Sequence, residues 1–244
     1  MTKGEISMAR VVGIGHQDFE TIRIKNNFYI DKTEFIKEWW ESDDAVTLIT
    51  RPRRFGKTLN MSMLEKFFSI EYAKRDELFE GLNIWKYKEY REIQGRYPVI
   101  FLSFANVKEN TYEQARESIC RIIQELYNKN IFLLHTDLLT DNEKEEYKQI
   151  STKMNDSMIS DSIRKMSDYL SRYYGKKTII LLDEYDTPIQ EAYVGGFWPD
   201  LMGVLRSLLN STFKTNPYLE RAVMTGITRV SKESIFSDLN NLEV

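Results

Sequence analysis

The sequence has little of what marks a secreted, membrane-spanning or metal-clustered protein. It contains one cysteine, Cys120, so a framework of disulfides within the chain is excluded. The two histidines, His16 and His135, lie far apart with no cysteine beside either, which argues against a metal site built on them. No apolar run approaches the ~20 residues of a membrane span, and the N-terminus lacks the apolar segment of a signal peptide. We therefore expect a cytoplasmic protein with no membrane partner.

Neither sign of charge dominates the chain. A net charge of −3 provides no global attraction to nucleic acid, although it leaves a local basic patch open. The length of 244 residues suits one α/β domain with an appendage. We expect an N-terminal extension over residues 1–44, packed on a core over residues 45–244. Because the chain stops at Leu242-Glu243-Val244 without a polar tail, we expect the core to be truncated on its C-terminal side.

Apolar runs alternate with amphipathic patterns along the chain. The predicted buried strands are 45–50, 98–104, 178–182 and 221–226. Amphipathic helices are predicted between them, and the order strand, helix, strand is typical of a parallel sheet covered by helices on both faces. In the extension, residues 19–30 predict a short β-hairpin around a turn at Asn26-Asn27. The polar stretch 137–155 is compatible with either a solvated helix or a loop.

An arginine-rich loop follows the first predicted strand. Arg51–Thr58 matches the phosphate-binding pattern G-x-x-x-x-G-K-[ST] in its last three positions, with Arg51 where the first glycine normally stands. Backbone N–H groups at a helix N-terminus bind phosphate, and Gly56 lets the backbone approach closely. Lys57 is suited to reach the terminal phosphates and Thr58 to ligate Mg²⁺. Taken alone, this half-pattern is as compatible with chance as with function.

A second motif places two carboxylates after a buried strand. The apolar run Thr178–Leu182 leads into Asp183 and Glu184, at the edge of a sheet where open α/β proteins bind ligands. We expect Asp183 to hold Mg²⁺, directly or through water, and Glu184 to orient and deprotonate an attacking water. A turn or a helix cap is the plainer explanation for this pair alone. The two motifs in this order on separate strands together predict an ATP site with Mg²⁺.

These two motifs resemble the AAA-ATPase-like family of prokaryotic proteins, which belongs to the P-loop class with an additional catalytic glutamate. The resemblance rests on Arg51–Thr58 and on Asp183–Ile189. It extends over most of the chain through Phe28–Thr33, Leu78–Trp85 and Tyr218–Val244. In this family the loop commonly reads Arg-Pro-Arg-Arg-Phe-Gly-Lys, which makes Arg51 a family trait. Members often carry a C-terminal nuclease-like domain of the PD-(D/E)XK type, so the resemblance implies such a downstream partner, and nucleic acid through it.

The resemblance also implies roles near the end of the chain. The strand after the acidic one ends in a polar residue that senses the terminal phosphate, and Thr225 or Thr228 would hold this role. Arg229 would stabilise charge on the transferring phosphoryl group, with a solvated surface charge as the alternative. The residues expected to contact the nucleotide from the loop are Arg53, Arg54, Phe55, Gly56, Lys57, Thr58 and Leu59. For Arg53 and Arg54 the alternatives are contact with a partner's nucleic acid and a role as solvated loop charges.

The function expected from these residues is ATP binding and Mg²⁺-dependent hydrolysis that drives a conformational change in a larger protein. Lys57, Glu184 and Arg229 would carry the catalysis. One alternative is a nucleotide-gated switch with little turnover of its own, completed by an arginine from a neighbouring subunit in a homo-oligomer. Another is a small-molecule kinase, which needs an acceptor site and a lid. Phe28 and Tyr29 are candidates to stack on the base, with packing against the sheet as the favoured explanation.

Overall fold

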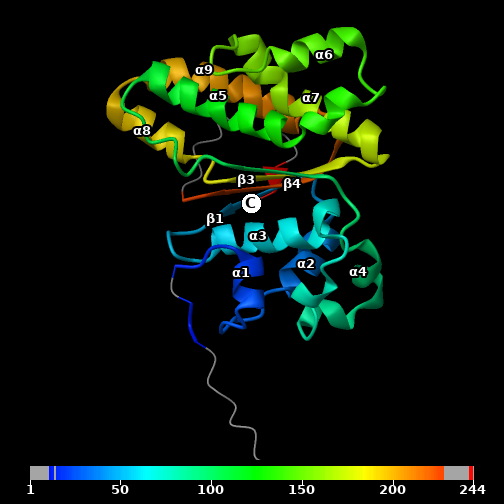
Figure 1. Ribbon diagram of the computed structural model, residues 1–244. Coiled ribbons are helices and arrows are strands. Elements are labelled where there is room, and N and C mark those ends of the chain that lie inside the picture. The colour runs from blue at the N-terminus through cyan, green and yellow to red at the C-terminus, as the bar shows by residue number, and fades with distance from the viewer. Residues whose placement is uncertain (1–10, 14, 228–241, 244) are drawn as a thin grey trace, which may run out of the picture.

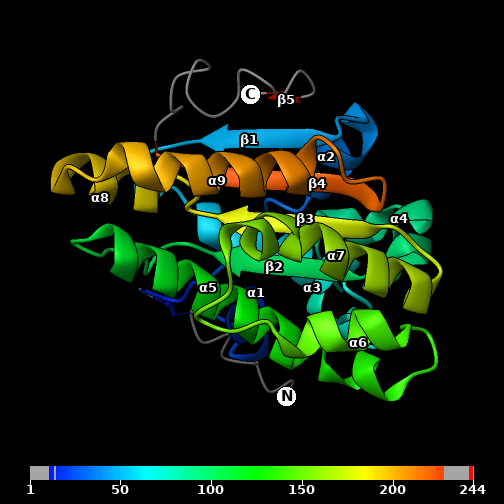
Figure 2. The same ribbon diagram turned by 90° about the horizontal axis from the view of Figure 1, so that it is seen from above.

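The protein is an α/β structure built on one parallel sheet. The computed structural model describes residues 11–13, 15–227 and 242–243. The strands are β1 (Val46–Thr50), β2 (Val99–Ser103), β3 (Thr178–Asp183), β4 (Leu219–Gly226) and β5 (Leu242–Glu243). They lie in the order β2-β3-β4-β1-β5, and each neighbouring pair is parallel (Figure 2). The predicted parallel sheet is confirmed.

Two layers of helices sandwich the sheet (Figure 1). One layer holds α1 (Phe19–Ile24), α2 (Glu34–Ser42), α3 (Lys57–Phe68) and α4 (Lys88–Ile93). The other holds α5 (Tyr112–Lys129), α6 (Asp141–Lys148), α7 (Asp156–Tyr174), α8 (Thr187–Gly195) and α9 (Trp198–Phe213). Short 3-10 helices lie at Ile70–Tyr72, Asp76–Leu78, Asn83–Lys86 and Ile131–His135. None of the helices that the structure describes is long and apolar enough to cross a membrane.

The alternation of side chains along the strands divides the interior into two cores. Ile179 and Leu181 of β3 pack with Phe67 of α3 in one core, and Ile180 and Leu182 pack with α5, α7 and α9 in the other. Successive side chains of a strand point to opposite faces of the sheet. The same alternation continues to the ends of the strands, so the side chain of the next residue after Leu182 lies on the α3 face.

The predicted N-terminal β-hairpin is wrong. Residues 19–24 form helix α1, and residues 28–32 have no regular structure. The Asp18 side chain accepts a hydrogen bond from the Thr21 amide at 2.8 Å, which caps the helix. Phe19 and Ile22, three residues apart, are buried on the same helical face. A local cap together with burial on α3 therefore outweighs the strand-like alternation of the sequence.

Helix α2 is tied to the sheet by Arg221 of β4. The Arg221 guanidinium donates to the carbonyl oxygens of Trp39 at 3.2 Å and Trp40 at 2.7 Å, and pairs with Asp43 at 2.8 Å. These carbonyls belong to the last turn of α2, where backbone acceptors have no partners within the helix. A cation at this end also meets the negative end of the helix dipole. Arg221 therefore holds the end of α2 against the sheet.

The stretch 137–155, which the sequence left open, contains helix α6. Its first turn carries a capping box, in which the Thr140 hydroxyl accepts from the Glu143 amide and the Glu143 carboxylate accepts from the Thr140 amide. Tyr147 is buried and anchors this otherwise polar helix to the core. The following helix, α7, ends at Gly175 in the left-handed conformation, as the sequence predicted.

Candidate nucleotide site

The carboxyl ends of three adjacent strands meet at one edge of the sheet. Strand β4 lies between β3 and β1, and Ile49 is paired in register with Thr225. The Arg51 amide donates to the Gly226 carbonyl at 3.2 Å, so the loop after β1 leaves the sheet directly beside the end of β4. This adjacency, which depends on the strand order, brings the loop and the Asp183-Glu184 pair together.

The loop from Arg51 to Gly56 leads into the N-terminus of α3. Gly56 has φ 77° and Arg54 has φ 70°, so two residues of the loop adopt the left-handed backbone conformation. Helix α3 begins at Lys57 directly after the loop, and its first amides have no partners within the helix and no side-chain cap. The Lys57 ammonium donates to the carbonyl oxygens of Arg51 at 2.8 Å and Pro52 at 3.1 Å. Its charge is therefore held at the start of the loop, beside the Arg51 and Pro52 carbonyls.

Four polar residues form a connected network where the strands end. The Thr58 hydroxyl donates to Asp183 Oδ2 at 2.8 Å, and the Thr225 hydroxyl donates to Asp183 Oδ1. The Glu184 amide donates to Thr225 Oγ1 at 3.2 Å. Asp183 and Thr225 are almost completely buried, and both continue the alternation that points toward α3. The structure therefore joins residues that are 125 positions apart in the sequence.

Glu184 occupies an unusual backbone conformation. Its φ of 52° lies in the left-handed region, which costs a residue with a side chain of the order of 1 kcal/mol. Thr187 at the start of α8 donates to Glu184 Oε2 at 3.2 Å. Residues held in such strain cluster at functional sites, because the surrounding structure must maintain them. Glu184 is half-buried beside Thr58 in the cavity described below.

Gly226 allows Asp186 to lie close to the end of β4. A Cβ at Gly226 would be 2.7 Å from a ring carbon of Tyr185 and 2.8 Å from Asp186 Oδ1. Asp186 Oδ2 accepts hydrogen bonds from the Ile227 amide at 2.9 Å and from Gln190 Nε2 at 2.7 Å. These contacts give Asp186 a role in supporting the turn after β3.

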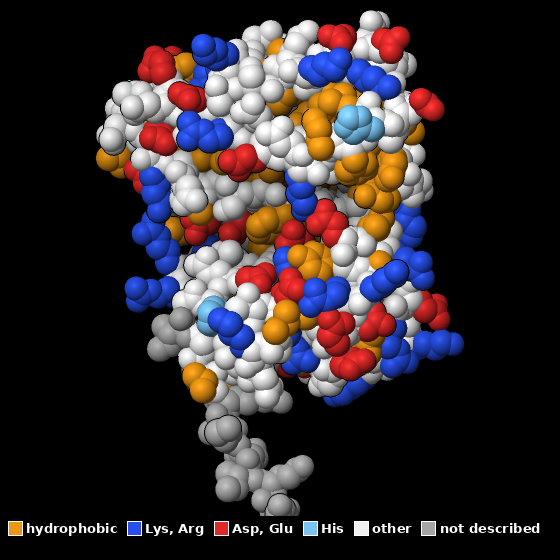
Figure 3. Space-filling model, in the orientation of Figure 1, with side chains coloured by type: hydrophobic (Ala, Val, Ile, Leu, Met, Phe, Trp, Pro, Cys, Tyr) orange, Lys and Arg blue, Asp and Glu red, His pale blue; other side chains and the backbone are white. Residues whose placement is uncertain are grey.

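A cavity of about 470 Å³ opens at the loop. The predicted residues that line it are Arg53, Arg54, Gly56, Lys57, Thr58, Leu59 and Glu184. It is also lined by residues that sequence reasoning missed, namely His16 and Gln17 before α1 and Lys108 after β2. Basic side chains follow this edge of the molecule (Figure 3). The position of Lys108, just beyond the strand that pairs with β3, was the one available signal, because parallel strands present their carboxyl ends at the same edge.

Other predicted residues lie elsewhere. Phe55 is 60% exposed and lines a neighbouring cavity on the other side of Lys57. Tyr29 packs edge-on against Phe19, with ring centroids 5.4 Å apart, and its hydroxyl contacts Met63 Sδ at 3.4 Å. These contacts favour a packing role for Tyr29. Phe28 is exposed. Thr228 and Arg229 lie outside the described residues.

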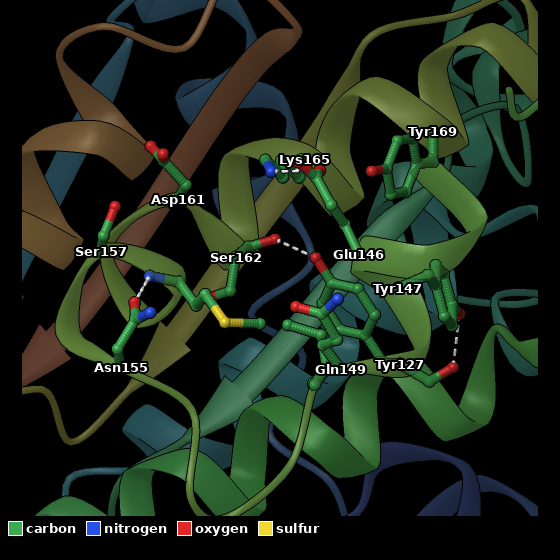
Figure 4. Close-up of a pocket in the computed structure, with 12 residues that line it drawn as sticks. Tyr127, Glu146, Tyr147, Gln149, Asn155, Ser157, Asp161, Ser162, Lys165 and Tyr169 are labelled. Carbon is green, nitrogen blue, oxygen red and sulfur yellow. Dashed lines mark hydrogen bonds and ion pairs between the residues drawn. The ribbon is translucent and has the colours of Figure 1, made fainter. Parts of the chain in front are cut away.

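A separate cavity of about 250 Å³ lies in the opposite helical layer, between α5, α6 and α7 (Figure 4). The buried tyrosines Tyr127, Tyr147 and Tyr169 contribute to its lining. Tyr127 donates to the Ser162 carbonyl at 2.8 Å, and Tyr147 donates to the Tyr127 carbonyl at 2.6 Å. Burial raises the pKa of all three phenols, which keeps them neutral. No residue of the Arg51–Thr58 loop lines this cavity, in contrast to the cavity at the edge of the sheet.

The oxygens of Thr58 and Asp183 fit Mg²⁺. Hydroxyl and carboxylate oxygens are the ligands that Mg²⁺ prefers, and in proteins it binds through one or two carboxylates together with phosphate oxygens and water. The two groups are already 2.8 Å apart, on α3 and at the end of β3. Among the described residues no cluster of three or more histidine, cysteine or acidic side chains forms a metal cage. A Mg²⁺ ion held by these two groups would need further ligands, such as phosphate oxygens and water.

This arrangement defines the class of the protein. A parallel sheet in this order, a Gly-Lys-Thr loop leading from β1 into a helix, and an acidic residue at the end of β3 are the features of P-loop nucleoside triphosphatases. The chain belongs to the AAA-ATPase-like family, described as "Predicted AAA-ATPase", whose model matches residues 13–236. Membership implies ATP binding and hydrolysis as the general activity.

The chain is also similar to a curated relative from Azotobacter chroococcum mcd 1, named "Uncharacterized protein in vnfD 5'region". The two are 28% identical over 235 residues. The match covers 94% of this chain and 40% of the relative, so the chain spans less than half of the relative's length. No solved structure matches the chain.

Proposed function

We propose that the chain is an ATP-hydrolysing domain whose nucleotide site is the cavity at the loop. The observation that carries this proposal is the network in which Thr58, Asp183 and Thr225 meet beside Gly56 and Lys57. A buried carboxylate is costly unless its hydrogen bonds are satisfied, and two hydroxyl donors satisfy Asp183 here. Of the two hydroxyls that satisfy Asp183, that of Thr58 stands in the first turn of α3 next to Lys57, where a phosphate would bind, and that of Thr225 stands at the end of β4.

Each residue of the site has a distinct task in this proposal. The amides at the start of α3 and the Lys57 ammonium bind the β- and γ-phosphates. Thr58 and Asp183 hold Mg²⁺, which neutralises charge on the phosphates when it is bound. Glu184 accepts a proton from a water molecule whose oxygen attacks the γ-phosphorus, and the bond from that phosphorus to the β–γ bridging oxygen breaks to release ADP. Thr225 keeps Asp183 and the backbone of Glu184 in position.

Lys108, Arg53 and Arg54 line the same cavity and extend the binding role beyond the loop. We include Arg229 in the proposal as the cation that stabilises charge on the transferring phosphoryl group. Hydrolysis would drive a conformational change in a longer protein, in keeping with the greater length of the relative. A downstream nuclease-like domain and assembly into a homo-oligomer are part of this proposal.

Binding of ATP with Mg²⁺ to the wild type and to Lys57→Ala is the primary test. Lys57→Ala should weaken binding by on the order of a hundredfold, because it removes a charge-assisted contact of about 1.5–3 kcal/mol. Lys74→Ala, which changes an exposed lysine away from the cavity, is the matched control and should bind as the wild type does. Equal affinity of wild type and Lys57→Ala would remove the phosphate-loop assignment.

Phosphate release by Glu184→Gln separates hydrolysis from simple switching. We expect Glu184→Gln to bind ATP normally and to lose turnover by roughly 10²–10⁴-fold, the usual contribution of a general base. Glu191→Gln on the following helix α8 makes the same change of charge outside the cavity and should retain turnover. ATP binding with no Glu184-dependent release at any protein concentration would favour the nucleotide-gated switch. Transfer of phosphate to a metabolite in place of water would favour a kinase.

A further inference from the structure

A second cavity, of about 340 Å³, lies beside the loop on the β1 side of Lys57. Its lining includes Lys32 before α2, Arg51 and Phe55 of the loop, and Thr225 at the end of β4. Lys57 lines both this cavity and the one at Glu184, so its side chain lies between the two. A ligand bound at the loop can therefore be contacted from both sides of Lys57.

The charges around this second cavity all have the same sign. Lys32, Arg51 and Lys57 line it, and no acidic side chain of the described residues does. The two carboxylates closest to Lys32 in the sequence make hydrogen bonds outside this cavity. Asp31 accepts from Thr33 and from the Asn83 amide, and Glu34 lies 3.3 Å from the Tyr87 hydroxyl. Three cations without counter-charges repel one another, so the cavity favours an anion.

Two helix N-termini add to this preference. Helix α3 begins at Lys57 and helix α2 at Glu34, and residues adjoining both starts line the cavity. The amides of a first helical turn carry partial positive charge. In α2 the Phe35 and Ile36 amides already donate to the Lys32 and Thr33 carbonyls at 3.1 and 3.0 Å, so this helix contributes mainly through its dipole. Helix α2 has nine residues and no side-chain hydrogen bond to its first turn from its N-cap, Thr33. The Thr33 hydroxyl instead donates to Asp31.

Lys32 is held in place by its two neighbours. Asp31 Oδ1 accepts from the Thr33 amide at 2.9 Å and from its hydroxyl at 2.6 Å, and Asp31 Oδ2 accepts from the Asn83 amide at 2.7 Å. Thr33 Oγ1 in turn accepts from the Ile84 amide at 3.1 Å. These bonds clamp the backbone on both sides of Lys32 to the start of the 3-10 helix Asn83–Lys86. The Lys32 side chain itself is exposed and has no hydrogen bond or ion pair among the described residues.

We propose that this cavity binds phosphate oxygens of the nucleotide and that Lys32 contacts them directly, with Arg51 as a second cation. The proposal rests on the proposed function and adds a phosphate contact that the loop motif does not contain. It also assigns a task to the residue that replaces the first glycine of the loop. Arg51 then contributes a charge at the position where most phosphate loops have none.

The test measures ATP affinity over a range of salt concentrations for the wild type, Lys32→Met, Lys32→Arg and Lys25→Met. Lys32→Met keeps the aliphatic stem and removes the charge, so we expect it to weaken ATP binding about tenfold, or about 1.4 kcal/mol. It should also make the affinity less sensitive to salt, since one ionic contact is lost. Lys32→Arg should recover most of the affinity. Lys25→Met removes the same charge from an exposed position outside the cavity and should bind ATP as the wild type does.

Several outcomes would overturn the proposal. Wild-type affinity in Lys32→Met would do so, as would an equal loss in Lys32→Met and Lys32→Arg with unchanged salt dependence, which indicates a packing role. Arg51→Gly restores the usual glycine and should also weaken binding, whereas tighter binding would show that Arg51 hinders the ligand. A wild type that binds no ATP refutes the proposed function itself. A wild type that binds ATP while Lys32→Met is unaffected refutes this contact alone.

Discussion

The Thr225 hydroxyl connects the two acidic residues of the site. It donates to the Asp183 carboxylate and accepts from the Glu184 amide at 3.2 Å. Asp183 is almost completely buried, so its charge depends on the donors that surround it. Removing one of them changes both the orientation of the carboxylate and the turn that carries Glu184. Thr225 is therefore a positioning residue in the proposed reaction.

Thr225→Val tests this role with little change in shape. We expect turnover of ATP to fall by roughly tenfold or more, since a hydrogen bond to a charged group contributes about 1.5–3 kcal/mol. The concentration of Mg²⁺ needed for half-maximal turnover should rise, because Asp183 is less well oriented. Thr215→Val, at an exposed position after α9, is the control. Unchanged Mg²⁺ dependence together with unchanged turnover would contradict the role.

At the scale of elements, the segment before α2 is held by the carboxylate of Asp31. Burial alone would raise the pKa of Asp31, but hydrogen bonds from the Thr33 hydroxyl and from the Thr33 and Asn83 amides outweigh it and bring the pKa below its ordinary value of 3.8. A carboxyl group whose pKa is lower in the folded state stabilises the fold above its unfolded pKa. That contribution is lost as the pH falls through the folded value.

Asp31→Asn should therefore destabilise the protein at neutral pH, and this destabilisation should disappear in acid. We expect the difference in unfolding free energy between wild type and Asp31→Asn to be constant above about pH 5 and to shrink as the pH falls below about 4. Urea unfolding followed at pH 7, 5, 4 and 3 measures this difference. A difference that stays the same across the whole range would show that the Asp31 charge has no part in the clamp.

At the scale of the whole molecule, one sheet packs against a hydrophobic core on each of its two faces. Strands β3 and β4 contribute alternate side chains to both, so neither core can lose its packing without disturbing the sheet that supports the other. Three of the four tryptophans, Trp39, Trp40 and Trp85, lie on or around the α3-side core, whereas Trp198 and the long helices α5, α7 and α9 lie on the opposite face. Tryptophan fluorescence therefore reports mainly on the α3 side of the sheet, and far-UV circular dichroism reports mainly on the long helices of the opposite layer.

Phe67→Ala should destabilise both layers together. Phe67 is fully buried on α3, and truncation of such a side chain costs about 3–5 kcal/mol. We expect the fluorescence and circular dichroism transitions in urea to shift to lower concentration by the same amount and to remain coincident. Ile131→Ala changes a side chain that is 46% exposed and should shift them little. Two separate transitions in the variant would show that the layers unfold independently.

The sequence predicted most of the sheet and the long helices because their signals are local. The buried strand Thr178–Asp183, the capped helix after Thr111 and the glycine at position 175 each depend on neighbouring residues. The hairpin over residues 19–30 was wrong because the cap at Asp18 and burial on α3 decide that segment. Lys32 was missed because a single lysine in a loop carries no local signal. Lys108 was missed because its one signal, a position beyond β2, depends on knowing that β2 pairs with β3.

The sequence by itself determined the two motifs of the proposed site, since the order Gly56-Lys57-Thr58 and the pair Asp183-Glu184 need no distant contact to be recognised. The tertiary structure decided which other residues lie next to these two motifs. Strand order places the end of β4 between the other two, and the two-residue period of the strands turns Asp183 and Thr225 toward the same helix. The position of Lys32 beside Arg51 depends on the hydrogen bonds of its neighbours Asp31 and Thr33 to the amides of Asn83 and Ile84. These partners lie more than 50 positions away in the sequence, so no local pattern encodes the contact.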